Sequence, residues 1–199
     1  MEKMQKQLEK IQGNLMQSKN ELPIELKTRM AEIILNLIKR RKSFGFFVIL
    51  GWSNKWKKFA DTPDASQDIF AGHNINVKRQ ASEKTRQGIV KTVNFDGAIL
   101  VDSAGNIVHS GAMIEGLRPK VAADKINPGR FADLSTQFGF MQKVHMRHLA
   151  AITASHIFKG TTVFTVSEET GHFHIFENGR ILYSTLSEEN KQSAGTQEH

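Results

Sequence analysis

The sequence predicts an α/β protein in which a mixed central β-sheet is flanked by helices, with a helical extension at the N-terminus. Short apolar or β-branched runs alternate along the chain with segments of helical periodicity, which favours a sheet covered by helices. Turn signals join neighbouring strands near the middle and near the end, so some strand pairs are expected to be antiparallel. The 199 residues, 39% of them hydrophobic, suffice for one domain with its own core.

The first two elements are expected to be helices. An apolar stripe at spacings of three and four predicts a helix that ends between Asn20 and Pro23; it consists of Met1, Met4, Leu8, Ile11 and Leu15. We expect this stripe to pack on the main domain or on a partner chain, so residues 1–22 are assigned as an oligomerisation or regulatory segment. A second helix is predicted from Pro23 to Lys42, with cations at its C-terminal end where the helix dipole favours them.

The main domain is expected to span residues 23–186. Phe46 to Leu50 reads as a buried strand closed by Gly51. Strands are also predicted at 98–101, 107–109 and 161–166, and a hairpin at 173–183 turns at Asn178-Gly179. Helices are expected at 82–94 and 144–158, whereas 52–80 is rich in loops without a clear assignment and 115–143 looks irregular. Residues 187–199 form a polar C-terminal tail.

Composition excludes several classes of function. The absence of cysteine rules out disulfides, thiolate metal sites and a cysteine nucleophile. No apolar run approaches the roughly 20 residues that cross a bilayer, and the polar N-terminal segment does not resemble a signal peptide. We therefore expect a soluble, cytoplasmic protein with no membrane partner.

The net charge of +7 is unevenly distributed. Residues 1–58 contain 13 Lys and Arg side chains against 5 Asp and Glu, a net charge of +8, whereas the remainder sums to −1. Such a local excess is more often a solvated face than a nucleic-acid site. The charge distribution therefore argues against a nucleic-acid partner.

Three short clusters contain side chains suited to phosphate chemistry. Asp96-Gly97-Ala98 precedes a buried strand, and its carboxylate can hold a divalent cation while Gly97 and Ala98 let a flat ligand approach the backbone. Arg147-His148 lies near a helix N-terminus, which favours anions, and Arg offers a fork of donors to phosphate oxygens. The run Ser167-Glu168-Glu169-Thr170-Gly171 ends a strand and supplies the oxygen ligands that Mg²⁺ prefers.

Each cluster also has an ordinary structural interpretation when taken alone. Asp-Gly is a common turn pair, Arg147-His148 can be a surface Arg and a half-buried His, and the acidic run can be a polar hairpin turn. His172 and His174 share a strand face, but no third metal ligand is evident, so solvent-facing positions are expected for them. The sequence contains no Walker lysine loop, dinucleotide glycine fingerprint or nucleophile elbow.

In their order and spacing, the three clusters resemble the diadenylate cyclase domain, the catalytic part of the DNA-integrity scanning protein. That family has an Asp-Gly-Ala motif, an Arg-His-Arg motif, a Ser-Glu-Glu-Thr-Gly-like segment and an Asn-Gly hairpin. The resemblance covers about residues 45–186, and the Phe70 to Asn74 stretch resembles the minimal archaeal-type branch. It implies the diadenylate cyclase domain fold for the sheet described above.

The resemblance also implies roles for individual residues. Asp96 would bind the catalytic metal, Mn²⁺ or Mg²⁺, and help to activate a ribose 3′-hydroxyl, and Glu168 would help to place that metal. Arg147 and His148 would hold the triphosphate. The remaining nucleotide-binding positions are Gly97, Ala98, Met146, Leu149, Ser167 and Glu169. This sequence departs from the family at Leu149, which replaces the second Arg, and at His145-Met146, which replaces Gly-Thr.

The activity implied is the condensation of two ATP molecules into cyclic di-AMP and pyrophosphate. Because each subunit would bind one ATP, two subunits must face each other, and a homo-oligomer is required. Two alternatives stay open. Leu149 and Met146 suit a catalytically degenerate module that binds ATP or a cyclic dinucleotide. Trp52 and Trp56, among lysines, suit a nucleic-acid-binding protein.

Overall fold

The computed structural model describes residues 2–41, 44–64, 66, 68, 70, 75–79, 89, 97–186 and 189. Its helices are α1 (Glu2–Met16), α2 (Ile24–Arg40), α4 (Pro119–Ile126), α5 (Leu134–Gln137) and α6 (Met146–Ile157), with the 3-10 helix η1 (Asn54–Phe59). The strands are β1 (Phe46–Trp52), β2 (Ala60–Asp61), β3 (Ala98–Asp102), β4 (Ile107–Ile114), β5 (Thr162–Val166), β6 (Phe173–Glu177) and β7 (Arg180–Ser184).

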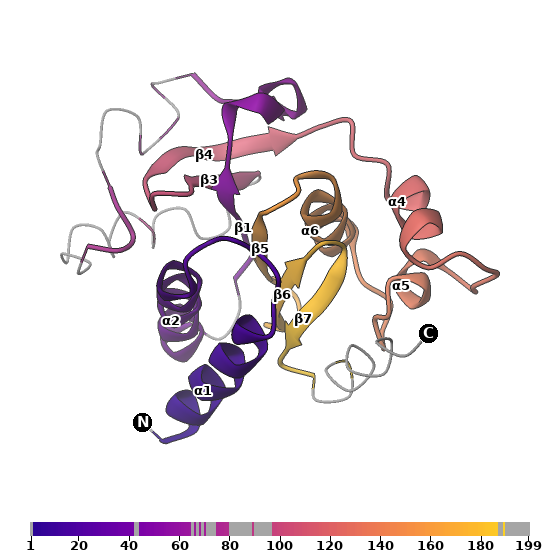
Figure 1. The fold of residues 1–199 in the computed structure, drawn as a ribbon, viewed down its shortest axis with the longest axis horizontal. Helices are drawn as coiled ribbons and strands as arrows, with labels where there is room; N and C mark the ends of the chain where they lie inside the picture. The colour runs from indigo at the N-terminus through magenta and orange to yellow at the C-terminus, as the bar shows by residue number, and fades with distance from the viewer. Residues whose placement is uncertain are drawn as a thin grey trace.

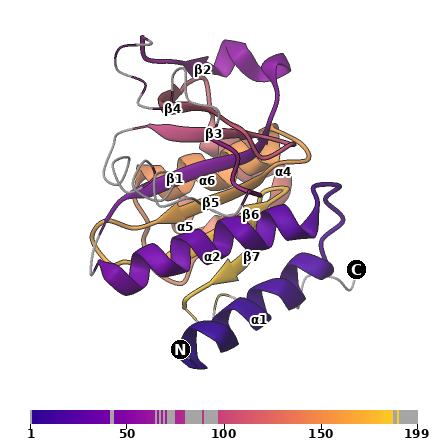
Figure 2. The same ribbon diagram turned by 90° about the vertical axis from the view of Figure 1, so that its left-hand side faces the viewer.

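Within these residues the strands form one sheet of seven, in the order β2-β4-β3-β1-β5-β6-β7. Only β1 and β3 pair in parallel; the other described neighbours are antiparallel. Helices α1 and α2 lie on one side of the sheet, and α6 lies on the other with α4 and α5 beside it (Figures 1 and 2). The predicted mixed α/β sheet flanked by helices, with its N-terminal helical extension, is therefore confirmed.

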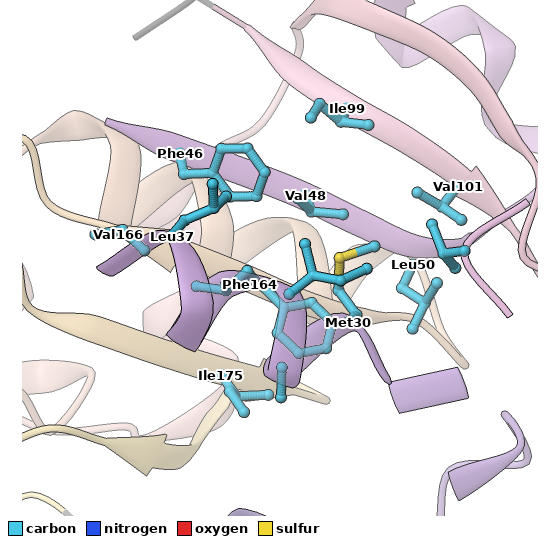
Figure 3. Close-up of a cluster of buried hydrophobic side chains, with 14 of the residues drawn as sticks. Met30, Leu37, Phe46, Val48, Leu50, Ile99, Val101, Phe164, Val166 and Ile175 are labelled. Atoms are coloured by element: carbon cyan, nitrogen blue, oxygen red, sulfur yellow. The ribbon is translucent and has the colours of Figure 1, made fainter. Parts of the chain in front are cut away.

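Strand β1 supplies the centre of both hydrophobic cores. Its side chains alternate between the faces because successive Cβ atoms of a strand point in opposite directions. Phe46, Val48 and Leu50 pack toward α2, where they meet Met30 and Leu37 (Figure 3). Phe47 and Ile49 pack toward α6 in the second core. Burial on both faces explains why this strand appears in the sequence as an unbroken apolar run.

The apolar stripe of α1 packs on the chain's own main domain. Ile11 and Leu15 are fully or almost fully buried in the core beneath α2. The side-chain amide of Asn14 also donates a hydrogen bond of 2.7 Å to the carbonyl oxygen of Leu182 on β7. Of the two packing partners expected for this stripe, the main domain is therefore the one observed.

A buried ion pair joins the N-terminal helices α1 and α2 to the sheet. The ammonium group of Lys27 on α2 lies 3.3 Å from a carboxylate oxygen of Glu177 at the end of β6, and both side chains are almost completely buried. The hydroxyl of Thr162 donates to the same carboxylate at 2.6 Å, and Ser18, between α1 and α2, hydrogen-bonds to its other oxygen. Two buried charges are tolerated only with such additional partners.

The C-terminal hairpin forms as predicted. Asn178 and Gly179 have φ angles of 52° and 79°, which is the backbone of the two-residue turn that matches the twist of the flanking strands. The adjoining strands run one residue further than expected at the end of β6 and of β7.

The prediction that 115–143 is irregular is wrong, because this region contains α4 and α5. Pro119 starts α4 instead of breaking it, since the first helical position needs no N–H donor. Asp133 caps α5 by accepting a hydrogen bond from the backbone N–H of Thr136 at 2.8 Å.

Three other expectations concern segments that lie largely outside the described residues. Of the helix expected at 82–94 only Ile89 is described, and of the tail from 187 only Glu189 is described. Of the Phe70 to Asn74 stretch, only Phe70 is described. Among the helices that are described, none is both long and apolar enough to cross a bilayer.

Candidate active site

Strand register brings two of the three predicted clusters to one edge of the sheet. Phe46, the first residue of β1, pairs with Val166, the last residue of β5. On the other side of β1, Val48 pairs with Ile99 of the parallel strand β3. The beginning of β3, with Gly97 and Ala98, therefore lies one strand away from the beginning of β1, and Ser167 lies one strand away on the opposite side, with neighbouring strands about 4.8 Å apart. Asp96 lies outside the described residues.

The third cluster joins the same edge through the start of α6. The Nη1 atom of Arg147 lies 3.8 Å from Oε2 of Glu168, and only a quarter of the Arg147 side chain is exposed. Nε2 of His145 lies 2.9 Å from Oε2 of Glu169. Two acid–base contacts thus connect the N-terminal end of α6, where the helix dipole favours anions, to the loop that follows β5.

That loop is a tight turn built on Ser167. The backbone N–H of Gly171 donates to the carbonyl of Ser167 at 2.9 Å, and the N–H of Thr170 donates to its hydroxyl oxygen at 3.2 Å. Gly171 has a φ of 68°, a conformation that glycine adopts without strain. The turn holds Glu168 and Glu169 toward α6, and within the described part of the chain the Ser167 hydroxyl acts only as an acceptor.

His148 is buried below the surface at this edge of the sheet. The side chain is 5% exposed, and its ring centroid lies 4.9 Å from that of His174 and 6.1 Å from that of Phe140. Burial, followed by the nearby charges of His174 and Arg147, lowers the pKa of His148 from 6.5 to about 3. The imidazole is therefore neutral at pH 7 and can donate only one hydrogen.

A cavity of about 50 Å³ joins His148 to the loop. Its lining includes His148, Ser167, Thr170 and His172. Nε2 of His148 is buried and has no hydrogen-bond partner among the residues that the structure describes. His148 and Ser167 therefore line one cavity, but Nε2 of His148 is buried and does not open into it with the ring in this position.

The expectation that His174 faces solvent is wrong. It is 1% exposed, because β6 is buried on both faces and the alternation of a half-buried strand does not apply. Its Nε2 lies 2.7 Å from a carboxylate oxygen of Glu189. Burial raises the pKa of Glu189, but hydrogen bonds from His174, Ser184 and the N–H of Met141 outweigh it, so the net shift of the pKa is downward. The carboxylate is therefore ionised, and Nε2 of His174 donates to it. No three metal-ligating side chains gather within the described part of the chain.

Four further positions have distinct surroundings. Met146 is 71% exposed at the first position of α6, whereas Leu149 is buried in the core below the helix. Ala98 is fully buried at the start of β3. Gly97 has a φ of 97°, and a methyl group placed on it would lie 2.6 Å from the carbonyl carbon of Gly111 on β4. The close approach of β4 therefore requires glycine there independently of any ligand.

Sequence patterns missed two contributors to this region. Gly45, directly before β1, lies against the guanidinium of Arg147, and Glu189 reaches His174 from beyond β7. A single glycine before a strand carries no sequence signal for such a contact. A glutamate in a polar tail likewise gives no sign of burial.

The two tryptophans that suggested a nucleic-acid partner are buried. Trp52 and Trp56 pack against Phe158 with ring centroids 5.3 and 5.2 Å apart, and neither is more than a tenth exposed. Their rings are therefore closed to base stacking, and the interpretation as a single-strand binding surface is wrong for these residues.

No family model and no curated protein matches the chain. Solved structures do. A hypothetical membrane-spanning protein from Bacillus cereus aligns with a TM-score of 0.47 and 18% identity, over 79% of this chain and 62% of that protein, so this chain spans less than two thirds of it. A double mutant of DacA from Staphylococcus aureus, a diadenylate cyclase, aligns with a TM-score of 0.45 and 15% identity, over 85% of this chain and 91% of DacA.

Proposed function

We propose that the protein is a diadenylate cyclase that condenses two ATP molecules into cyclic di-AMP and two pyrophosphates. The observation that supports this most directly is the 3.8 Å approach of Arg147 to Glu168 at the edge of the sheet where Gly97 precedes β3 and Ala98 begins it. These residues come from separate motifs of one family pattern. A cation and a carboxylate placed side by side can serve a metal-bound triphosphate, the cation on phosphate oxygens and the carboxylate on the metal.

The donor set suits Mn²⁺ or Mg²⁺. Glu168 offers carboxylate oxygens and its side chain is more than half exposed at the rim of the site. Asp96, one residue before Gly97 in the sequence, would supply the second carboxylate. When bound, the metal would offset negative charge on the phosphates and orient them for in-line displacement.

The chain's own residues would hold the substrate. Arg147 would bind phosphate oxygens with its planar fork, aided by the N-terminal end of α6. The Ser167 hydroxyl would donate one hydrogen bond from the shared cavity, and neutral His148 would donate another after its ring turns Nε2 toward that cavity. Met146, Leu149 and Glu169 occupy the remaining motif positions; the exposed Met146 side chain could pack on the nucleotide, whereas Leu149 would act only through the packing of α6.

The reaction forms two phosphorus–oxygen bonds, breaks two others and releases two hydroxyl protons. Each ribose 3′-oxygen attacks the α-phosphorus of the other ATP, the α–β phosphate bridge breaks, and pyrophosphate leaves with its electron pair. Asp96 would take up the proton of the 3′-hydroxyl. Because one subunit offers one such site, two subunits facing each other would complete the reaction, and catalysis would come mostly from positioning and electrostatics.

The direct test is incubation with ATP and Mn²⁺ or Mg²⁺, followed by mass analysis of the products. We expect cyclic di-AMP from the wild type and at least a hundredfold less from Asp96→Asn, which keeps the shape of the side chain but removes its charge. Equal product from both proteins would remove Asp96 from the mechanism. No cyclic dinucleotide from the wild type under either metal would reject the proposed activity.

A module that binds ATP or a cyclic dinucleotide without catalysis is the second candidate. The burial of Leu149 favours it, because the motif position that carries a second Arg in the family contributes no cation to the site here. Calorimetry with ATP and with cyclic di-AMP, combined with the product analysis, separates the two candidates. Binding without any product would support the module.

A further inference from the structure

Gly45 sits where a side chain would collide with the phosphate-binding cation. A methyl group placed on this residue would lie 2.7 Å from Cζ and 2.8 Å from Nη2 of Arg147, and nearer still to Nη1. All three atoms belong to the guanidinium group. Ordinary contacts between such atoms are about 3.5–4.0 Å, so the guanidinium would have to move by about 1 Å.

The backbone of Gly45 does not by itself call for glycine. Its φ lies outside the left-handed region, unlike those of Gly97, Gly160 and Gly171. The residue is buried, and it precedes β1, whose first residue pairs with the end of β5. Among the described residues, the three atoms nearest to a methyl group on Gly45 all belong to Arg147, so the missing side chain leaves the space that the guanidinium occupies.

The guanidinium is thus held between two groups. The backbone of Gly45 lies on one side, and Oε2 of Glu168 lies 3.8 Å from Nη1. A quarter of the Arg147 side chain stays exposed, so part of this side chain is open to a ligand while the guanidinium lies beside both groups. A cation set back against a strand terminus in this way holds a phosphate deeper in the site than a freely extended arginine would.

We propose that Gly45 is a positioning residue for ATP: it seats the Arg147 guanidinium against the start of β1 and so sets the depth at which the triphosphate is bound. The choice of ATP as the ligand rests on the proposed function, whereas the contact between Gly45 and the Arg147 guanidinium, called the seat below, does not. Gly45→Ala should displace the tip of a flexible side chain rather than any backbone, so the fold is retained while the phosphate contact is lost.

The test measures ATP affinity by calorimetry with Mg²⁺ for the wild type, Gly45→Ala, Arg147→Ala and the double variant. We expect Gly45→Ala to weaken binding at least tenfold with the melting temperature within about two degrees of the wild type. In the Arg147→Ala background the same change should have no further effect. Gly13→Ala is the matched control, because a methyl group there meets nothing within 4 Å.

A second measurement separates failure of the seat from failure of the function. The Nε–H signal of Arg147 in a proton–nitrogen spectrum should shift in Gly45→Ala and stay in place in Gly13→Ala, without any ligand. An unchanged signal overturns the seat even if no ATP binds. An equal loss of affinity with and without the Arg147 side chain, or no loss while the wild type binds ATP, overturns the positioning role and leaves the proposed function intact.

Discussion

Acidification from pH 7 to pH 5 should destabilise the protein through His148. This imidazole has a pKa of about 3 in the folded chain against 6.5 as its ordinary value, because it is buried beside His174 and Arg147. Below pH 6.5 the unfolded chain therefore binds a proton that the folded chain does not. The free energy of unfolding falls by about 1.4 kcal/mol for each pH unit below 6.5, which is about 2 kcal/mol at pH 5.

Urea unfolding at pH 7, 6 and 5 measures this loss, and His148→Phe provides the comparison. Phenylalanine keeps an aromatic ring against Phe140 and His174 but does not titrate. His172 and His156, whose pKa values burial also lowers, are present in both proteins, so their titration enters both measurements. The wild type should lose about 2 kcal/mol more than the variant between pH 7 and 5. Equal losses would show that His148 is not buried as a neutral base.

Three further predictions concern stability and binding. Lys27→Met should lower the free energy of unfolding by about 3–5 kcal/mol, because it leaves the buried carboxylate of Glu177 without its cation, and adding Glu177→Gln should recover part of that loss in urea unfolding. Gly97→Ala should lower the free energy of unfolding by more than about 2 kcal/mol. Gly160→Ala should lower it by less, because Gly160 has a similar positive φ but open space where Gly97 meets Gly111. Equal losses for the two variants in thermal melts would contradict this prediction. Arg147→Ala should weaken ATP binding by roughly 10- to 150-fold, which is equivalent to about 1.5–3 kcal/mol for charge-assisted hydrogen bonds. Arg147→Lys should keep only part of the wild-type affinity, because an ammonium group lacks the planar fork of a guanidinium. Wild-type affinity for Arg147→Lys in calorimetry would argue against bidentate phosphate binding.

Much of the fold follows from local patterns in the sequence. The apolar run of β1 and the Asn178-Gly179 turn each specify one local structure, and both form as predicted. The helices α4 and α5 were missed because Pro119 and Asp133 start helices here, whereas the same residue types also mark loops. Local pattern cannot separate these cases, since the outcome depends on the packing of α4 against α6 and of α5 against α4.

The candidate site, like the fold, could be predicted from the sequence only in part. The resemblance implies that Arg147 and Glu168 serve the same nucleotide, and the packing of α6 against β5 brings the start of this helix beside the loop that follows β5. The burial of His174 and the contact of Gly45 with Arg147 depend on partners distant along the chain, so no local signal could reveal them. Asp96 lies outside the described residues, and its role stays a prediction.

The central claim is that the starts of β1, β3 and α6 and the end of β5 form one binding site for a triphosphate. A nuclear magnetic resonance titration of the backbone amides with Mg²⁺ and a non-hydrolysable ATP analogue tests it most directly. The amides of Gly45, Gly97, Arg147 and Ser167 should shift together with one dissociation constant, while that of Gly13 stays unchanged. Shifts confined to one of these segments, or gathered elsewhere on the chain, would contradict the claim.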